Sequence, residues 1–174
     1  MSVIWITGLS GSGKTTLSKA IKEKLTDQGV FAIHLDGDEV REIIHTDLGY
    51  SPEDRFTHIS RIQRMAKLIS EQDIIVIVSA LYFDEKLSEW NKNNYKKYLE
   101  VYIHASLELL HKRDQKNIYS RFSENQLQNV MGLDIPYSSP INPHLTFYAD
   151  EEIDPKLMAS QIIQQLGKQN LKCK

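Results

Sequence analysis

Residues 8–15, near the start of the chain, have the spacing of a phosphate-binding loop. Their sequence, GLSGSGKT, matches the pattern G-x-x-x-x-G-K-[ST] at every fixed position. Glycines allow such a loop to turn its backbone N–H groups towards phosphate oxygens at the N-terminus of a helix. In this pattern Lys14 reaches the β- and γ-phosphates of a nucleoside triphosphate, and the Thr15 hydroxyl binds Mg²⁺. The sequence therefore predicts a triphosphate site made by Gly8, Leu9, Ser10, Gly11, Ser12, Gly13, Lys14, Thr15 and Thr16.

Two other kinds of loop, and one other class of phosphate-loop protein, fit the sequence less well. A dinucleotide-binding fingerprint that starts at Gly11 fails, because its sixth position is Thr16 rather than glycine. A glycine turn without a ligand does not explain why the loop lies between a predicted strand and a predicted helix. A GTPase-like switch should carry the string N-K-x-D after a late strand. The nearest string, residues 91–94, ends in asparagine and lies within a predicted helix, so we interpret it as a solvent-facing helix surface and favour a kinase.

A second polar cluster, residues 36–38 (Asp-Gly-Asp), follows directly after a predicted strand at residues 30–35. Ligands of open α/β sheets bind at the carboxyl ends of the strands, so we expect both carboxylates beside the phosphate loop. Arg41 follows within one helical turn, and Arg55 lies early in the next predicted helix. A kinase needs such groups to orient an acceptor and to neutralise the transferring phosphoryl group. An ordinary turn is the alternative for the acidic cluster.

The hydrophobic pattern around these motifs alternates between strands and helices. Short β-branched runs predict strands at residues 3–7, 30–35, 74–80, 99–104 and 145–148. Amphipathic segments predict helices at residues 15–28, from about 39, from 52, and at 85–95, 107–113 and 155–166. This alternation predicts an α/β fold, the three-layer P-loop NTPase fold, with a parallel sheet and helices on both faces. A lid segment is expected at about residues 114–143, where the pattern weakens and three prolines occur.

Length and composition limit the classes of protein that remain. The chain has 174 residues, of which 41% are hydrophobic and 25% are charged, and its formal net charge is -2. These values fit a single domain over residues 1–174, without an overall basic field for nucleic acid or an anionic membrane. No apolar run approaches the roughly 20 residues of a membrane span. The one cysteine, Cys173, cannot form an internal disulfide. We expect a cytoplasmic protein that binds neither nucleic acid nor membranes.

Several motifs together resemble the adenylylsulfate (APS) kinases. The similar segments are residues 8–16, residues 35–38 with Arg41, residues 48–55 and 100–102, Arg113 and Asp114 with Lys116 and Tyr119, and residues 132–137 with Asn142 and Pro143. The similarity extends from about Val3 to Leu145 in one register, which makes it far more specific than the phosphate loop alone. The resemblance implies an enzyme that uses Mg-ATP to phosphorylate the ribose 3′-hydroxyl of a small-molecule 5′-nucleotide. It also implies a homodimer.

The same resemblance implies roles for individual residues. Asp36 is the candidate general base on the 3′-hydroxyl and a contact of Mg²⁺ through water, while Lys14 acts on the transferring phosphoryl group. Tyr50 stacks on the acceptor base, as an aromatic ring can. The acceptor-binding residues are Asp38, Arg41, Tyr50, Arg55, His58, Val130 and, from the lid, Lys116. Further cations of the lid are Lys112, Arg113 and Arg121.

Several acceptor-site positions depart from the family pattern. Tyr82 and Phe83 replace a serine-proline pair, His58 replaces an asparagine, and Val130 replaces an aromatic residue. Loss of one stacking face removes about 1–3 kcal/mol from base binding. We therefore expect an acceptor other than APS. The chain also resembles kinases that phosphorylate cytidine diphosphoramidate in capsule phosphoramidate synthesis, and this resemblance implies that compound as the acceptor. The alternatives are a true APS kinase, which makes 3′-phosphoadenylylsulfate in sulfate assimilation, and a non-enzymatic nucleotide sensor.

Overall fold

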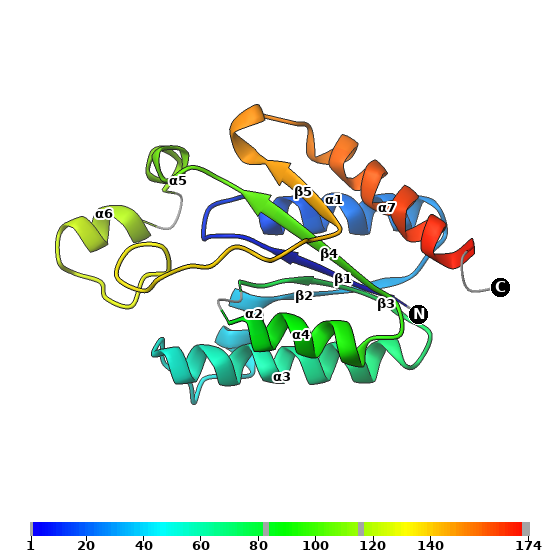
Figure 1. Cartoon of the computed structure of the whole chain (residues 1–174), viewed down its shortest axis with the longest axis horizontal. Helices are drawn as coiled ribbons and strands as arrows, with labels where there is room; N and C mark the ends of the chain where they lie inside the picture. Colours follow the sequence, from blue (N-terminus) through cyan, green and yellow to red (C-terminus); the bar gives the residue numbers. More distant parts are fainter. Residues whose placement is uncertain (1, 82–83, 115–116, 172–174) are drawn as a thin grey trace.

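Five parallel strands form one sheet through the middle of the molecule (Figure 1). The computed structural model describes residues 2–81, 84–114 and 117–171. The strands are β1 (Val3–Thr7), β2 (Ala32–Asp36), β3 (Ile75–Ser79), β4 (Tyr98–His104) and β5 (Leu145–Tyr148). Their order is β2-β3-β1-β4-β5. The phosphate loop therefore follows the central strand, β1, at the carboxyl ends of the strands.

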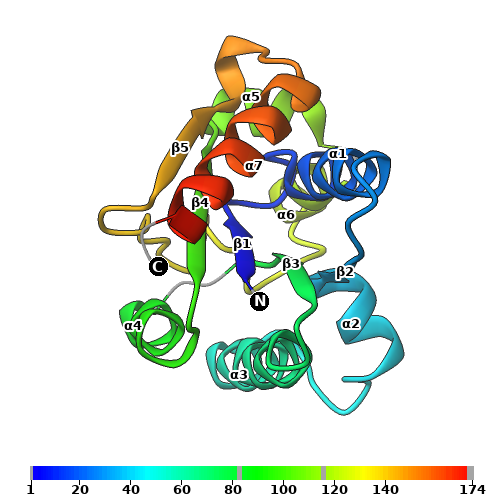
Figure 2. The ribbon, with the colours of Figure 1, turned by 90° about the vertical axis from the view of Figure 1, so that its right-hand side faces the viewer.

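Helices cover both faces of the sheet (Figure 2). They are α1 (Lys14–Asp27), α2 (Gly37–Ile43), α3 (Pro52–Ser70), α4 (Glu85–Asn94), α5 (Leu107–Arg113), α6 (Ile118–Ser123) and α7 (Pro155–Leu171), with a short 3-10 helix at Ala149–Glu151. α1 and α7 pack together on one face around Ile4 and Leu17. α3 and α4 cover the other face around Trp5 and Ile62. This arrangement confirms the predicted three-layer α/β fold.

The inner strands have the residue types that two covering layers require. All residues of β1 and β3 are buried, as expected for strands with helices on both sides. β2 begins two residues later than predicted, because Val30 still belongs to the turn that ends α1. The backbone N–H of Val30 donates to the Leu25 carbonyl at 2.9 Å, and Gly29 between them takes a φ of 72°. A glycine suits this left-handed position after a helix.

The start of α3 was correctly predicted. Ser51 precedes the helix, and its side chain accepts a hydrogen bond from the Asp54 backbone N–H at 3.2 Å. Pro52 occupies the first turn, where its missing N–H costs nothing. These contacts fix the direction in which α3 leaves the loop at residues 44–51.

Residues 114–143 contain a helix that the sequence pattern did not predict. α6 has only six residues, and it begins after Asn117, which has a φ of 52° and no side-chain capping bond. Helices this short lack the repeated apolar spacing on which sequence prediction depends. A lid function of residues 114–143 stays a prediction.

The prediction that residues 91–94 form a solvent-facing helix surface is wrong for the first of them. Asn91 is fully buried in α4. Its side-chain amide donates to the Tyr98 hydroxyl at 3.1 Å, and its oxygen accepts from Gln63 Nε2 at 2.8 Å. A polar side chain can be buried here because neighbouring groups satisfy its hydrogen bonds.

Glu100 on β4 is a second buried polar group in the same layer. The hydroxyls of Ser88 and Tyr98 each donate to its Oε1 at 3.1 Å. Burial raises the pKa of the Glu100 carboxyl to about 7. Lys92 Nζ, at 3.8 Å from Oε2, is too distant and too exposed to offset that burial.

We expect the replacement Glu100→Gln to flatten the pH dependence of stability. The folded-state pKa lies above the ordinary value of 4.5, so the stability that protonated Glu100 contributes is complete below pH 4.5 and is lost as the pH rises through about 7. The loss amounts to about 3 kcal/mol. Urea unfolding of both proteins across this pH range measures the difference. An identical pH slope in the variant would contradict the assignment.

Candidate active site

A large pocket of about 1310 Å³ opens at the carboxyl ends of β2 and β3, beside the loop that follows β1. The phosphate loop contributes residues 10–16, and the acidic turn contributes residues 36–38. The pocket therefore brings together the two polar clusters that the sequence singled out. Gly8 and Leu9 are not among its lining residues.

The backbone of the phosphate loop has the conformation that its glycines permit. A Cβ at Gly8 would lie 2.4 Å from the carbonyl oxygen of Ile103, so only glycine fits there. Gly13 has a φ of 104°, and no side chain caps the start of α1 behind it. The N-terminus of α1 therefore suits phosphate oxygens. Lys14 Nζ donates to the Leu9 carbonyl at 2.9 Å, which holds the ammonium group beside the loop.

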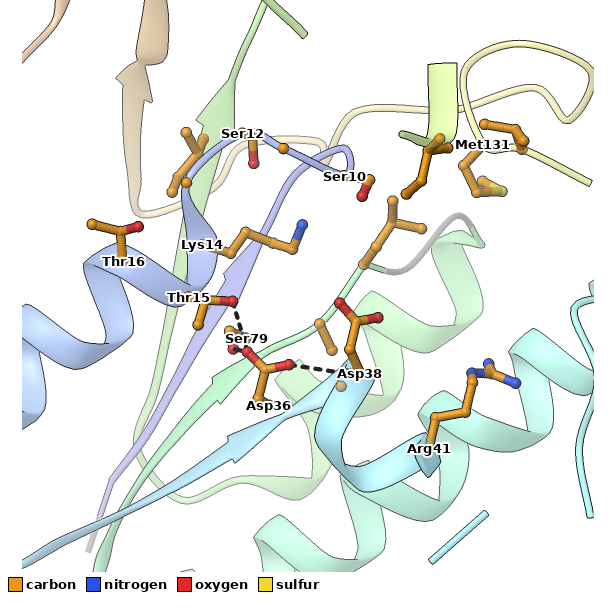
Figure 3. Close-up of a pocket in the computed structure, with 18 of the residues that line it drawn as sticks. Ser10, Ser12, Lys14, Thr15, Thr16, Asp36, Asp38, Arg41, Ser79 and Met131 are labelled. Carbon is orange, nitrogen blue, oxygen red and sulfur yellow. Dashed lines mark hydrogen bonds between the residues drawn. The ribbon is translucent and has the colours of Figure 1, made fainter. Parts of the chain in front are cut away.

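The carboxylate of Asp36 is the centre of a hydrogen-bond network at the end of β2 (Figure 3). Its Oδ2 accepts from Thr15 Oγ1 at 2.7 Å and from Ser79 Oγ at 2.8 Å. Its Oδ1 accepts from the Asp38 backbone N–H at 3.0 Å, and His34 Nε2 lies 2.8 Å from the Ser79 hydroxyl. Burial opposes ionisation of Asp36, but the hydrogen bonds outweigh it and lower the pKa below its usual range. Asp36 is therefore a carboxylate with both oxygens engaged.

The two carboxylates of the acidic turn differ in direction. Asp36 faces Thr15 and Ser79 at the floor of the pocket, whereas the Asp38 side chain points towards Lys14 and the phosphate loop (Figure 3). A lowered pKa and occupied oxygens make Asp36 a poor proton acceptor. This geometry favours Asp38 over Asp36 for contact with an acceptor hydroxyl.

Thr15 and Asp36 have the chemistry to hold a magnesium ion. A hydroxyl and a carboxylate meet at 2.7 Å beside the phosphate loop, and both are hard oxygen donors. Among the residues that the structure describes, no group of three or more His, Cys, Asp or Glu side chains could form a metal cage. Mg²⁺ usually takes most of its ligands from water and substrate phosphates, so this sparse donor set fits it.

We expect Asp36→Asn to lower kcat by roughly 10–100-fold and to raise the Mg²⁺ concentration needed for half-maximal rate. The amide removes the charge and turns an N–H towards the Thr15 or Ser79 hydroxyl. Initial rates over a Mg²⁺ titration measure both effects. Asp47→Asn is the control, because Asp47 is an exposed carboxylate that pairs with Arg61 away from the pocket lining. An unchanged kcat in Asp36→Asn would show that Asp36 takes no part in phosphoryl transfer.

Arg41, Tyr50 and Arg55 form one wall of the pocket. The Arg41 guanidinium carbon lies 4.9 Å from the centre of the Tyr50 ring, and that of Arg55 lies 5.4 Å from it. Arg55 also donates to the carbonyls of Tyr50, at 3.0 Å, and Asn129, at 2.6 Å. Two guanidinium groups beside a ring that is 58% exposed form a surface suited to a phosphate-bearing aromatic ligand.

The other residues that the sequence singled out for the acceptor site and the lid fall into three groups. His58, Val130, Arg113 and Arg121 line the pocket, whereas Lys112 is not among the lining residues. Lys116, Tyr82 and Phe83 lie outside the described residues.

Ser79 and His34 belong to the site but were not predicted from the sequence. Ser79 ends the buried strand β3, and a polar residue at that end of a strand is a usable signal. His34 reaches the site only through Ser79, which no local pattern reveals. Sequence reasoning also missed the pocket's far side, where the lining residues are Phe147, Tyr148, Ala149, Glu152, Ile153, Pro155 and Met158.

Most of the chain matches one known protein family. The family model described as adenylylsulphate kinase matches residues 1–148. The chain belongs to the adenylylsulphate kinase family. It is therefore an ATP-dependent phosphotransferase of that family.

Individual members of the adenylylsulphate kinase family are similar over most of the chain. An adenylyl-sulfate kinase of Clostridium acetobutylicum is 39% identical over 154 residues, which cover 87% of this chain and 77% of the relative. One of Halothermothrix orenii is 36% identical over 163 residues, covering 94% and 88%. A solved APS kinase of Mycobacterium tuberculosis, in complex with AMPPNP and APS, has a TM-score of 0.89 and 29% identity, covering 95% of this chain and 97% of that chain.

A more distant neighbour shows how widely the fold is shared. Shikimate kinase of Aquifex aeolicus has a TM-score of 0.54 at 16% identity, and this likeness concerns the fold alone. In the part of the chain that the structure describes, no helix has both the length and the apolar character needed to cross a membrane.

Proposed function

We propose that this kinase transfers the γ-phosphoryl group of Mg-ATP to the ribose 3′-hydroxyl of a 5′-nucleotide. One observation carries the proposal: the phosphate loop, the acidic turn and the wall of Arg41, Tyr50 and Arg55 line the same pocket. A triphosphate on the loop and a nucleotide on the wall would meet at the acidic turn. Holding two reactants in line is the main contribution of a protein to phosphoryl transfer.

The proposed reaction is an in-line displacement. The 3′-oxygen forms a bond to the γ-phosphorus, the bond between that phosphorus and the bridging oxygen breaks, and ADP leaves with the electron pair. The hydroxyl proton passes to the carboxylate of Asp38, which points towards Lys14. Lys14 offsets charge on the transferring group. Mg²⁺, held through Thr15 and Asp36, supplies further charge neutralisation when bound.

Adenylylsulfate is the acceptor that the comparisons favour. The relatives described above are named adenylyl-sulfate kinases, and the M. tuberculosis enzyme was solved with APS. Within this proposal the product is 3′-phosphoadenylylsulfate. Nothing in the comparisons supports the capsule phosphoramidate branch that the sequence led us to expect.

Cytidine diphosphoramidate remains a second candidate because of two residues in the pocket. His58 and Val130 both line it, and neither is the residue that the APS kinase pattern has at its position. Val130 offers no aromatic face to the base. A smaller pyrimidine loses less from that change than adenine does.

Steady-state kinetics with both acceptors tests the assignment. The purified kinase is assayed with saturating Mg-ATP and varied APS or cytidine diphosphoramidate. We expect a kcat/KM for APS at least tenfold above that for the cytidine compound. The reverse ranking would overturn adenylylsulfate as the preferred acceptor, but it would leave the proposed phosphoryl transfer in place. ATP consumption that does not increase with either acceptor would favour a non-enzymatic sensor and remove the proposed reaction. The homodimer stays a prediction, which light scattering of the same sample checks.

A further inference from the structure

Two buried histidines meet on the wall of the acceptor pocket. The Nδ1 atoms of His45 and His58 lie 2.7 Å apart, and their rings pack edge to face with centroids 5.0 Å apart. Both residues line the pocket, yet their exposed fractions are only 2% and 5%. The contact is therefore a hydrogen bond between two buried side chains from different segments.

Both rings are neutral at ordinary pH. Burial lowers the pKa of His45, and burial together with the Arg41 charge lowers that of His58 to about 3. Two neutral imidazoles can share a hydrogen bond between Nδ1 atoms only when one is the Nδ1–H tautomer and the other has a bare Nδ1. One ring is therefore the donor of this hydrogen bond, and the other is the acceptor.

The contact has the same geometry whichever ring donates. In either case one Nδ1–H donates to the other bare Nδ1, and both Nδ1 atoms are engaged by the protein. Neither Nδ1 is then a direct partner of the acceptor nucleotide.

The histidine pair joins the two segments that present the pocket's arginines. His45 follows Arg41 by four residues, just after α2, and its N–H donates to the Val40 carbonyl at 3.2 Å. His58 follows Arg55 by three residues on α3, so both lie on one face of that helix. Both guanidinium groups lie beside Tyr50. The contact between the histidines thus links the segment that carries Arg41 to the helix that carries Arg55.

We infer that His45 is a positioning residue for acceptor binding: its Nδ1 holds the His58 ring by a hydrogen bond and so helps to fix the spacing of Arg41 and Arg55. This inference rests on the proposed function, because it assumes that these arginines bind the anionic part of the acceptor nucleotide. His45 acts through His58 and does not touch the reacting atoms. No pattern in the sequence pointed to it.

Paired substitutions test this role. His45→Ala removes the partner of His58 Nδ1 and leaves that buried nitrogen without a hydrogen bond, so we expect the KM for APS, and in a second arm for cytidine diphosphoramidate, to rise about tenfold. The KM for ATP and kcat should change less than twofold, which a general loss of structure would not produce. His45→Asn keeps an N–H donor on the atom bonded to Cγ, as in histidine, and should restore the acceptor KM to within threefold of the wild type.

Nitrogen-15 NMR of the histidine rings tests the pair without substrates. We expect one ring as the Nδ1–H tautomer and the other as the Nε2–H tautomer at pH 7. His111→Ala, a histidine outside the pocket lining, aids signal assignment and should leave both tautomers unchanged. The same tautomer in both rings, an unchanged acceptor KM in His45→Ala, or no rescue in His45→Asn would each overturn the inference. Failure of the wild type to use either nucleotide would instead reject the proposed function, and with it the assumed role of the arginines.

Discussion

Replacement of Lys14 by alanine is expected to lower kcat about 10³-fold while the protein stays folded. Lys14 lines the pocket at the start of α1, and its ammonium group is held beside the phosphate loop by the Leu9 carbonyl. From there it can follow the negative charge that moves onto the β- and γ-phosphate oxygens during transfer. A methyl group at this position supplies no charge, and water that replaces it cannot be fixed in the same way.

The matched control for this variant is Lys19→Ala. Lys19 is an exposed lysine on the same helix and does not line the pocket. Initial rates at saturating substrates should show the loss only for Lys14→Ala, and circular dichroism melting should give similar Tm values for both variants. A Lys14→Ala enzyme within tenfold of the wild-type kcat would exclude Lys14 from transition-state stabilisation.

Asp38→Asn is expected to lower kcat by about 10²–10⁴-fold, the range associated with loss of a general base. Asp38 rather than Asp36 is the proton acceptor in the proposed reaction, because the Asp36 oxygens already accept hydrogen bonds from Thr15, Ser79 and the turn itself. The amide keeps the size of the side chain but cannot take the hydroxyl proton. The KM for ATP should change little, since Asp38 is assigned to the acceptor.

Glu39→Gln is the control for Asp38→Asn. Glu39 is the next residue, exposed and outside the pocket lining, so a loss of charge there should leave kcat within twofold of the wild type. Comparing Asp38→Asn with Asp36→Asn distinguishes the roles of the two carboxylates. Only Asp36→Asn should raise the Mg²⁺ concentration needed for half-maximal rate. A larger loss of kcat in Asp36→Asn than in Asp38→Asn would return the role of general base to Asp36.

The predicted strands and the phosphate loop agree with the structure because both depend on local sequence. Buried strands such as β3 need continuous apolar runs, and the phosphate loop needs glycines at positions of unusual backbone geometry, such as Gly13. Asn91 was misjudged because its burial depends on Gln63 and Tyr98, which are distant in the sequence. α6 was missed because six residues are too few to show a helical pattern.

Some features of the candidate site also follow from local sequence, whereas others depend on contacts between distant residues. The position of the site at the carboxyl ends of the strands could be predicted. The motifs directly follow strands, and the carboxyl ends of parallel strands lie at the same end of the sheet. The division of labour between Asp36 and Asp38 could not, since it depends on hydroxyls from α1 and β3. The pairing of His45 with His58 likewise appears only when the segment after α2 packs on α3.

The segment that contains α6 is attached at two separate points. The Tyr119 hydroxyl donates to the Ser10 carbonyl in the phosphate loop at 3.0 Å, and Arg55 donates to the Asn129 carbonyl on the opposite wall. We expect a ligand that shifts one attachment to change the free energy of the other, because both contacts restrain the same segment. By thermodynamic reciprocity, each substrate must then alter the affinity for its co-substrate by the same factor. The two nucleotides would not bind independently, and their dissociation constants measured singly and together would differ.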